Sequence, residues 1–246
     1  ALAEVREVDQ GAPAPTPQTK TLLGFNDWPG PNGTGTDWML ANDLPGFIVR
    51  PVFLGETARS FDYSAAERAG IRVILNLRYS WSTDEHGAGT IPVIDTDPWT
   101  RFVYAAAKTM QSSSGVWGWT IANETNNPRE FPHNRRLTPW YVIRTYNVIR
   151  ELAGGDFRMA PGALDPYHAS EGDPRDWLAT IWARISGAEF VPVHGYIRGP
   201  DPDLVGSDAR FTDAPLLWQK LNYEGCITAF LEALPIQYQD LDVYVT

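Results

Sequence analysis

The sequence predicts a parallel α/β fold, a (β/α)8 TIM barrel of which about seven β/α units are present. Short apolar runs typical of buried strands alternate with helical patterns along the chain. The segments that follow the strands are long and polar, whereas those that precede them are short, as expected when loops at the carboxyl ends of strands form a binding face. No glycine-rich phosphate loop follows a strand, which disfavours a nucleotide-binding doubly wound sheet.

The expected strands are, in chain order, 21–27, 46–54, 71–77, 116–123, 157–163, 189–196 and 241–246. Three helices between them have clear start signals, because a capping residue stands directly before a proline. These helices begin at Asp97, at Thr138 and at Asp173; Gly154 ends the second, and Gly187 ends the third. A closed barrel needs eight strands, so seven would leave the first and the last unpaired, and we expect possible self-association through these open barrel edges.

Composition limits the organisation and the partners of the chain. The 246 residues, 43% of them hydrophobic, suffice for one large core. We expect a Pro/Ala-rich linker or tail over 1–19 and a (β/α) barrel catalytic domain, C-terminally incomplete, over 20–246. The net charge of −10 disfavours nucleic acid and anionic lipid, and the apolar runs are too short for a membrane span.

The chain is therefore expected to be soluble, and its compartment stays open. A secreted protein whose leader was removed would begin as this chain does, and so would an arbitrary boundary. Cys226 is the single cysteine, so the sequence offers no internal disulfide and no cysteine-based zinc site, and its apolar neighbours predict that it is buried.

Glu124 is the main candidate for chemistry. It follows the apolar strand that contains Trp117, Trp119 and Ile121, and a polar loop comes after it. A carboxylate at the carboxyl end of a central strand lies at the barrel mouth, where it can donate a proton to a leaving group. The alternative is structural: Glu124 caps its loop or pairs with an arginine such as Arg129.

Three stretches resemble the large clan of retaining (β/α)8-barrel glycoside hydrolases, which includes cellulases, mannanases and β-galactosidases. "WTIANETNNP" is similar to the fourth-strand signature of that clan, "VPVHGY" to its sixth strand and "LDVYVT" to its seventh. The motifs cover only these short stretches, but they occur in the order of the clan. The resemblance implies a metal-independent glycosidase, without a cofactor, that cleaves a β-linked oligo- or polysaccharide by double displacement.

The resemblance also implies roles for individual residues. Glu124 would be the acid/base, and Asn123 would hydrogen-bond the sugar 2-hydroxyl. His194 and Tyr196 would line the cleft, and the nucleophile is expected directly after Thr246. A retaining glycosidase places its two carboxyl groups about 5 Å apart.

Further polar and aromatic residues within or after the predicted strands are candidates for substrate binding. They are Arg50, Asn26, Trp28, Asn76 and Trp81. Tryptophan offers a flat apolar face to sugar rings, but it also fills packed interfaces. Asp84, Glu85 and His86 are adjacent in one loop and cannot easily converge on one ion, so no metal site is expected.

Two other interpretations stay open at this stage. The chain could be an inactive or truncated barrel that binds carbohydrate, or a barrel hydrolase of different chemistry on a shared scaffold. The sugar, the linkage, the choice between endo and exo action and the oligomeric state depend on loops that one sequence does not define.

Overall fold

The computed structural model describes residues 24–26, 35–80, 89–132, 135–195, 216 and 223–246. The linker expected over 1–19 lies outside them. The elements are, in chain order, β1 (Gly24–Asn26), α1 (Gly35–Ala41), β2 (Gly46–Phe53), α2 (Ser64–Arg68), β3 (Ile71–Arg78), α3 (Asp97–Ser112), β4 (Gly118–Ile121), η1 (Pro128–Glu130), α4 (Pro139–Ala153), β5 (Met159–Pro161), α5 (Pro174–Trp182), β6 (Val191–Val193), α6 (Tyr223–Ala233), η4 (Ile236–Tyr238) and β7 (Val243–Val245). Each of the seven predicted strand regions coincides with one of these strands, and only β3 extends beyond its region, by Arg78.

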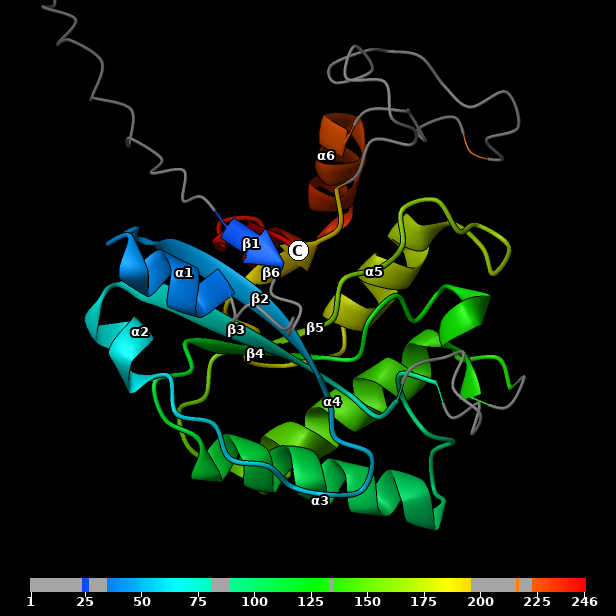
Figure 1. The fold of residues 1–246 in the computed structure, drawn as a ribbon. Coiled ribbons are helices and arrows are strands. Elements are labelled where there is room, and N and C mark those ends of the chain that lie inside the picture. The colour runs from blue at the N-terminus through cyan, green and yellow to red at the C-terminus, as the bar shows by residue number, and fades with distance from the viewer. Residues whose placement is uncertain (1–23, 27–34, 81–88, 133–134, 196–215, 217–222) are drawn as a thin grey trace, which may run out of the picture.

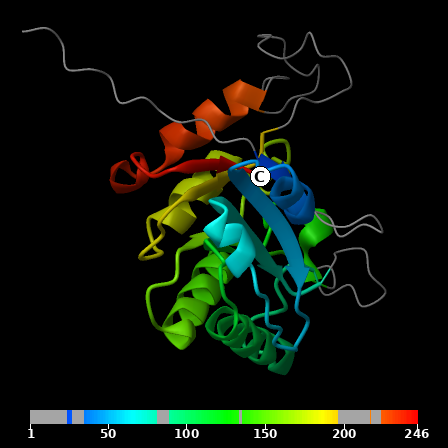
Figure 2. The same cartoon turned by 60° about the vertical axis from the view of Figure 1, so that its left-hand side comes forward.

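The strands are parallel and follow one another in chain order. Strands β1 to β5 form one sheet, and β6 pairs with β7 in a second (Figure 1). An isolated bridge between Met159 and Ala188 links the two sheets, where Glu189 N donates to Met159 O at 3.1 Å. Figure 2 shows the red C-terminal strand beside the yellow β6. No ladder joins β7 to β1 among the described residues, so the sheet order is that of a barrel without a closed ring of hydrogen bonds.

The helix start signals act as predicted, with one change of residue. The side chain of Thr96, one residue before the expected start, caps α3 by accepting from Trp99 N. Asp173 caps α5 by accepting from Arg175 N, and Gly154 ends α4 with a positive φ of 60°. Helix α5 ends at Trp182 with Ala183 as its C-cap, so the expected end at Gly187 was wrong. Proline in the first turn marks the start of all three helices, whereas glycine marks the end of α4 alone.

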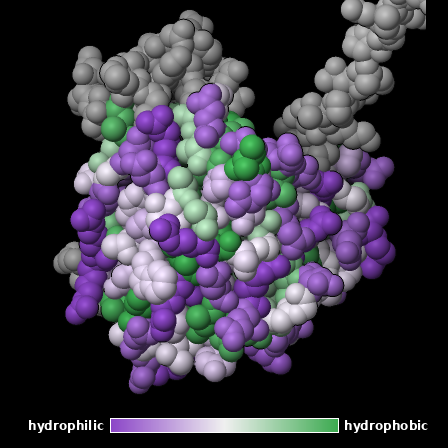
Figure 3. Space-filling view, turned by 180° about the vertical axis from the view of Figure 1, so that it is seen from behind, coloured by the Kyte–Doolittle hydropathy of each residue, from purple (hydrophilic) through white to green (hydrophobic). Residues whose placement is uncertain are grey.

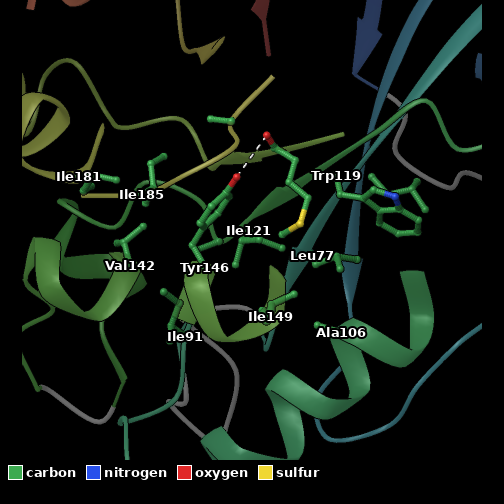
Figure 4. Close-up of a cluster of buried hydrophobic side chains, with 14 of the residues drawn as sticks. Leu77, Ile91, Ala106, Trp119, Ile121, Val142, Tyr146, Ile149, Ile181 and Ile185 are labelled. Atoms are coloured by element: carbon green, nitrogen blue, oxygen red, sulfur yellow. Dashed lines mark hydrogen bonds between the residues drawn. The ribbon is translucent and has the colours of Figure 1, made fainter. Parts of the chain in front are cut away.

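The larger core lies between the strands and the helices that cover them. Phe102 of α3, Tyr146 of α4 and Ile121 of β4 are fully buried in it. Figure 4 shows Tyr146 on α4 with aliphatic side chains around it, and its hydroxyl lies 3.5 Å from Met159 O. On the face in Figure 3 hydrophilic residues predominate and apolar ones are scattered, as expected when the apolar side chains are gathered inside.

A second apolar cluster fills the inner side of the curved sheet. It consists of Phe47, Val49, Ile74, Ala160, Phe190 and Tyr244. Because Tyr244 of β7 lies with its ring centroid 5.1 Å from that of Phe47 of β2, the last strand faces the early strands across a shared interior. The first and last thirds of the chain therefore meet, and the carboxyl ends of the strands form one mouth.

The described helices include none that is both long and apolar enough to cross a membrane. The outward side chains of β7, Val243 and Val245, are 38% and 41% exposed. Self-association through the open edges stays a prediction.

Candidate active site

Glu124 follows β4 in a backbone turn that neighbouring strands hold in place. Ala122 N donates to Leu77 O of β3 at 2.8 Å, and Glu124 N donates to Ala163 O, just after β5, at 2.7 Å. Both Ala122 and Glu124 have positive φ values, 69° and 43°, which side-chain-bearing residues rarely adopt. Such conformations persist where the surroundings over-determine them, and they cluster at functional sites.

Gly162 makes this turn sterically possible. A Cβ atom at that position would lie 2.0 Å from Ala122 O, which is backbone and cannot rotate away. Gly162 N also donates to Ile121 O at 2.8 Å, so the backbones after β4 and β5 approach closely. The direction of the Glu124 side chain is therefore set by main-chain contacts.

His194, at the end of β6, connects Glu124 to β7. Its Nε2 lies 3.3 Å from Glu124 Oε1 and 3.1 Å from Asn123 Oδ1. Its Nδ1 lies 2.5 Å from Thr246 O, directly after β7. The imidazole thus joins the ends of three strands that are far apart in the sequence.

Burial lowers the pKa of His194, and the negative charge of Glu124 and the Thr246 carbonyl oppose that shift. A carbonyl oxygen only accepts, so Nδ1 carries the proton of the neutral ring and Nε2 is left as an acceptor. Glu124 Oε1 lies 3.3 Å from this nitrogen. The geometry therefore suits a carboxyl group that gives up and takes back a proton.

A small polar cavity lies inside the mouth of the strands. Its lining is Asn26, Val49, Pro51, Asn76, Arg78, Thr120, Asn123, Ala163, Pro192, His194 and Thr246. Asn76 Nδ2 donates to Thr120 Oγ1 at 2.7 Å and to Ala122 O at 2.6 Å, and Arg78 Nε donates to Asn76 Oδ1. Four of the predicted binding residues, Asn26, Asn76, Asn123 and His194, thus meet in one place.

Arg50 does not line this cavity, and its role in substrate binding stays a prediction. Side chains alternate along a strand, and its neighbours Val49 and Pro51 face the cavity, so Arg50 faces the helices. Its guanidinium donates to the Tyr63 hydroxyl at 2.9 Å. Of the other predicted binding residues, Trp28, Trp81 and Tyr196 lie outside the described part of the chain.

The loop after Glu124 contributes residues that the strand pattern did not single out. Asn127 Nδ2 donates to Glu124 Oε2 at 3.1 Å. Glu130, at the end of η1, is mostly buried; burial raises its pKa to about 7, the Glu124 charge adds to the shift, and Arg78 opposes it. The sequence signal was Asn127-Pro128, because an asparagine cap before a proline starts a helical turn that carries Glu130 back toward the site.

Within the described residues, no group of three or more His, Cys, Asp or Glu side chains could hold a metal ion. Cys226 is buried, as its neighbours predicted.

Comparison with known proteins identifies the fold through solved structures. No family model and no curated protein matches the sequence. The GH39 enzyme from Xanthomonas axonopodis pv. citri is similar with a TM-score of 0.50 and 17% identity, over 86% of this chain and 46% of that chain. A monomeric β-xylosidase from Caulobacter crescentus CB15 has a TM-score of 0.47 and 17% identity, over 86% of this chain and 47% of that chain.

The chain spans less than half the length of these two structures. At such identity the likeness concerns the fold alone. The order of the parallel strands, the shared interior and the match to the GH39 enzyme agree. The chain has the parallel α/β fold of the TIM-barrel glycoside hydrolases.

Proposed function

We propose that this chain belongs to a retaining glycoside hydrolase that cleaves a β-linked saccharide, with Glu124 as the acid/base. The observation that carries the proposal is the contact of 3.3 Å between Glu124 Oε1 and the buried His194 Nε2 at the mouth of the strands. A carboxyl group beside a neutral imidazole can hold its proton until a leaving group needs it. The three sequence motifs of the clan meet at this contact, because it joins the ends of β4, β6 and β7.

The second carboxyl group of the mechanism is expected on the residue after Thr246. Thr246 N donates to Val193 O at 2.8 Å, and Thr246 O lies against His194, so β7 leads directly to the acid/base. We expect a glutamate at this position, with its carboxyl group about 5 Å from that of Glu124, as a retaining pair requires.

In the reaction, that nucleophile attacks the anomeric carbon while Glu124 transfers its proton to the departing oxygen. The resulting glycosyl ester is then cleaved by water, from which Glu124 takes a proton. Asn123 is held by its backbone N–H, which donates to Thr90 Oγ1 at 2.9 Å, and its side-chain amide lies beside His194, with Oδ1 3.1 Å from Nε2. This amide would hydrogen-bond the sugar 2-hydroxyl, as the resemblance to the clan implies.

The decisive experiment replaces Glu124 with Gln in the complete protein and varies the leaving group. The leaving-group oxygen of an aryl β-glycoside with an acidic phenol departs with little protonation, whereas that of a natural saccharide must be protonated. We therefore expect Glu124→Gln to lower kcat/KM about 100-fold or more on natural saccharides and to change the rate of the glycosylation step little with activated substrates. Glu67→Gln is the matched control, because Glu67 is an exposed carboxylate of α2.

Equal loss on both substrates, or no loss, would show that Glu124 is not the acid/base. Saccharide binding without hydrolysis by the complete wild-type protein would favour a carbohydrate-binding barrel instead. The residue encoded after Thr246 gives an independent check, since any residue without a carboxyl group there contradicts the predicted nucleophile.

A further inference from the structure

A chain of hydrogen bonds leads away from Glu124 on the side opposite His194. Asn127 Nδ2 lies 3.1 Å from Glu124 Oε2 and also 3.1 Å from Asp165 Oδ2. His168 Nδ1 lies 2.5 Å from the same Asp165 oxygen. These residues come from the loop after β4 and the loop after β5, and the clan motifs in the sequence do not include them.

The orientation of the Asn127 amide is fixed by its own turn. Its Oδ1 accepts from Arg129 N at 3.0 Å, so its Nδ2, which has two hydrogens, faces the two carboxyl groups. A reversed amide would place an oxygen against two carboxylate oxygens and a nitrogen against an N–H. Both hydrogens of Asn127 are thus used, one on each carboxyl group.

Asp165 holds the far end of this bridge. It is only 6% exposed, and its Oδ1 accepts from Tyr167 N at 2.8 Å. Its Oδ2 accepts from Asn127 and lies against His168 Nδ1. A second, buried carboxyl group is therefore held two hydrogen bonds from Glu124.

We propose that Asn127 and Asp165 are positioning residues for Glu124: the Asn127 amide holds Oε2, which leaves Oε1 to carry the transferred proton beside His194, and Asp165 holds the amide. The inference rests on the proposed role of Glu124. It assigns different jobs to the two oxygens of one carboxyl group, because each faces a different partner.

The two bridging residues should act on Glu124 in opposite directions. An N–H donor such as that of Asn127 favours a carboxylate, whereas a second carboxylate disfavours it. In the described part of the chain, the other ionisable groups around Glu124 are His194 at the end of β6, Glu130 of η1, Arg78 of β3, and His168, which contacts Asp165. Neither substitution below removes any of these groups.

The test is a carbon-13 NMR titration of the Glu124 carboxyl group in the complete protein, assigned by its loss in Glu124→Gln. Asn127→Ala removes the donor and should raise the titration midpoint by about one pH unit; Asp165→Asn removes the charge and should lower it by about one pH unit. Asn147→Ala is the control, because its amide on α4 donates to Arg184 O and should not move the midpoint.

The basic limb of the pH profile of kcat/KM should move in the same two directions, and Asn127→Ala should lower kcat about tenfold on poor leaving groups with little change in KM. If Asn127 and Asp165 only stabilised the structure, both substitutions would lower activity without moving the titration midpoint in opposite directions. If Asp165→Asn does not fold, as circular dichroism would report, Asn127→Ala still decides: an unchanged or lowered midpoint overturns the inference. Absence of any hydrolysis by the wild type would contradict the proposed function instead, and the NMR titration would still be readable.

Discussion

Replacing Glu130 with Gln should stabilise the protein at alkaline pH and leave its stability unchanged at acidic pH. Burial, assisted by the Glu124 charge and opposed by Arg78, raises the pKa of Glu130 from 4.5 to about 7 in the folded state. Between these values the folded protein keeps a proton that the unfolded chain has released. The folded state therefore loses stability relative to the unfolded state as pH rises from about 4.5 to about 7.

The magnitude follows from the shift, because one pKa unit corresponds to about 1.4 kcal/mol. The full shift corresponds to about 3 kcal/mol, reached above about pH 7, and residual solvent contact of the side chain makes this an upper value. Glutamine keeps the shape and cannot ionise, so the variant should escape this loss.

The assay is urea unfolding followed by tryptophan fluorescence at pH 4, 5, 6, 7 and 8. We expect the free energy of unfolding of Glu130→Gln to exceed that of the wild type by an amount that grows from pH 4 to pH 7 and then stays constant. Glu67→Gln, on an exposed carboxylate, should follow the wild type at every pH. If the curves of Glu130→Gln and the wild type run parallel, the reasoning about the buried carboxyl group is wrong.

Substitutions at three further residues test the packing at the site and in the core. His194→Ala leaves the buried Thr246 O without its donor, so urea unfolding should show a loss of about 2 kcal/mol at pH 7; a loss below about 1 kcal/mol would contradict this. Because burial lowers the pKa of His194, the wild type should also lose stability as pH falls below about 6.5, and His194→Ala should lack that part of the loss. Gly162→Ala should cost about 2 kcal/mol and lower activity, because its Cβ would displace Ala122 O; unchanged melting would argue against the close approach. Tyr146→Phe should cost less than about 1 kcal/mol in urea unfolding, because the hydroxyl contacts to Met159 O and Ser186 O are long at 3.5 Å, whereas Tyr146→Ala should cost about 4 kcal/mol, and equal losses would refute the assignment to packing.

The sequence predicted the strands and the main helices because their signals are local. An apolar run marks a buried strand, and a cap followed by proline marks the start of a helix, as Thr138-Pro139 does for α4. The division of the strands into one sheet of five and another of two was not predictable. It depends on how closely the segment before β6 approaches β5.

The site could be predicted where strand ends define it. Asn76, Asn123 and His194 meet because the carboxyl ends of parallel strands share one mouth. Arg50 lies on the other side of its strand, because side chains alternate along β2 and its neighbours Val49 and Pro51 face the cavity instead. Asn127 and Glu130 were not predicted as site residues. A loop brings them to Glu124, and the sequence does not define the path of that loop.

The most direct test of the central claim, that Glu124 is the acid/base of a retaining glycosidase, is chemical rescue of Glu124→Ala in the complete protein. With an activated aryl β-glycoside, added azide should replace the water that Glu124 normally activates, so the rate should rise with azide and the product should be the β-glycosyl azide. A rate that does not respond to azide, or an α-glycosyl azide product, would contradict the account.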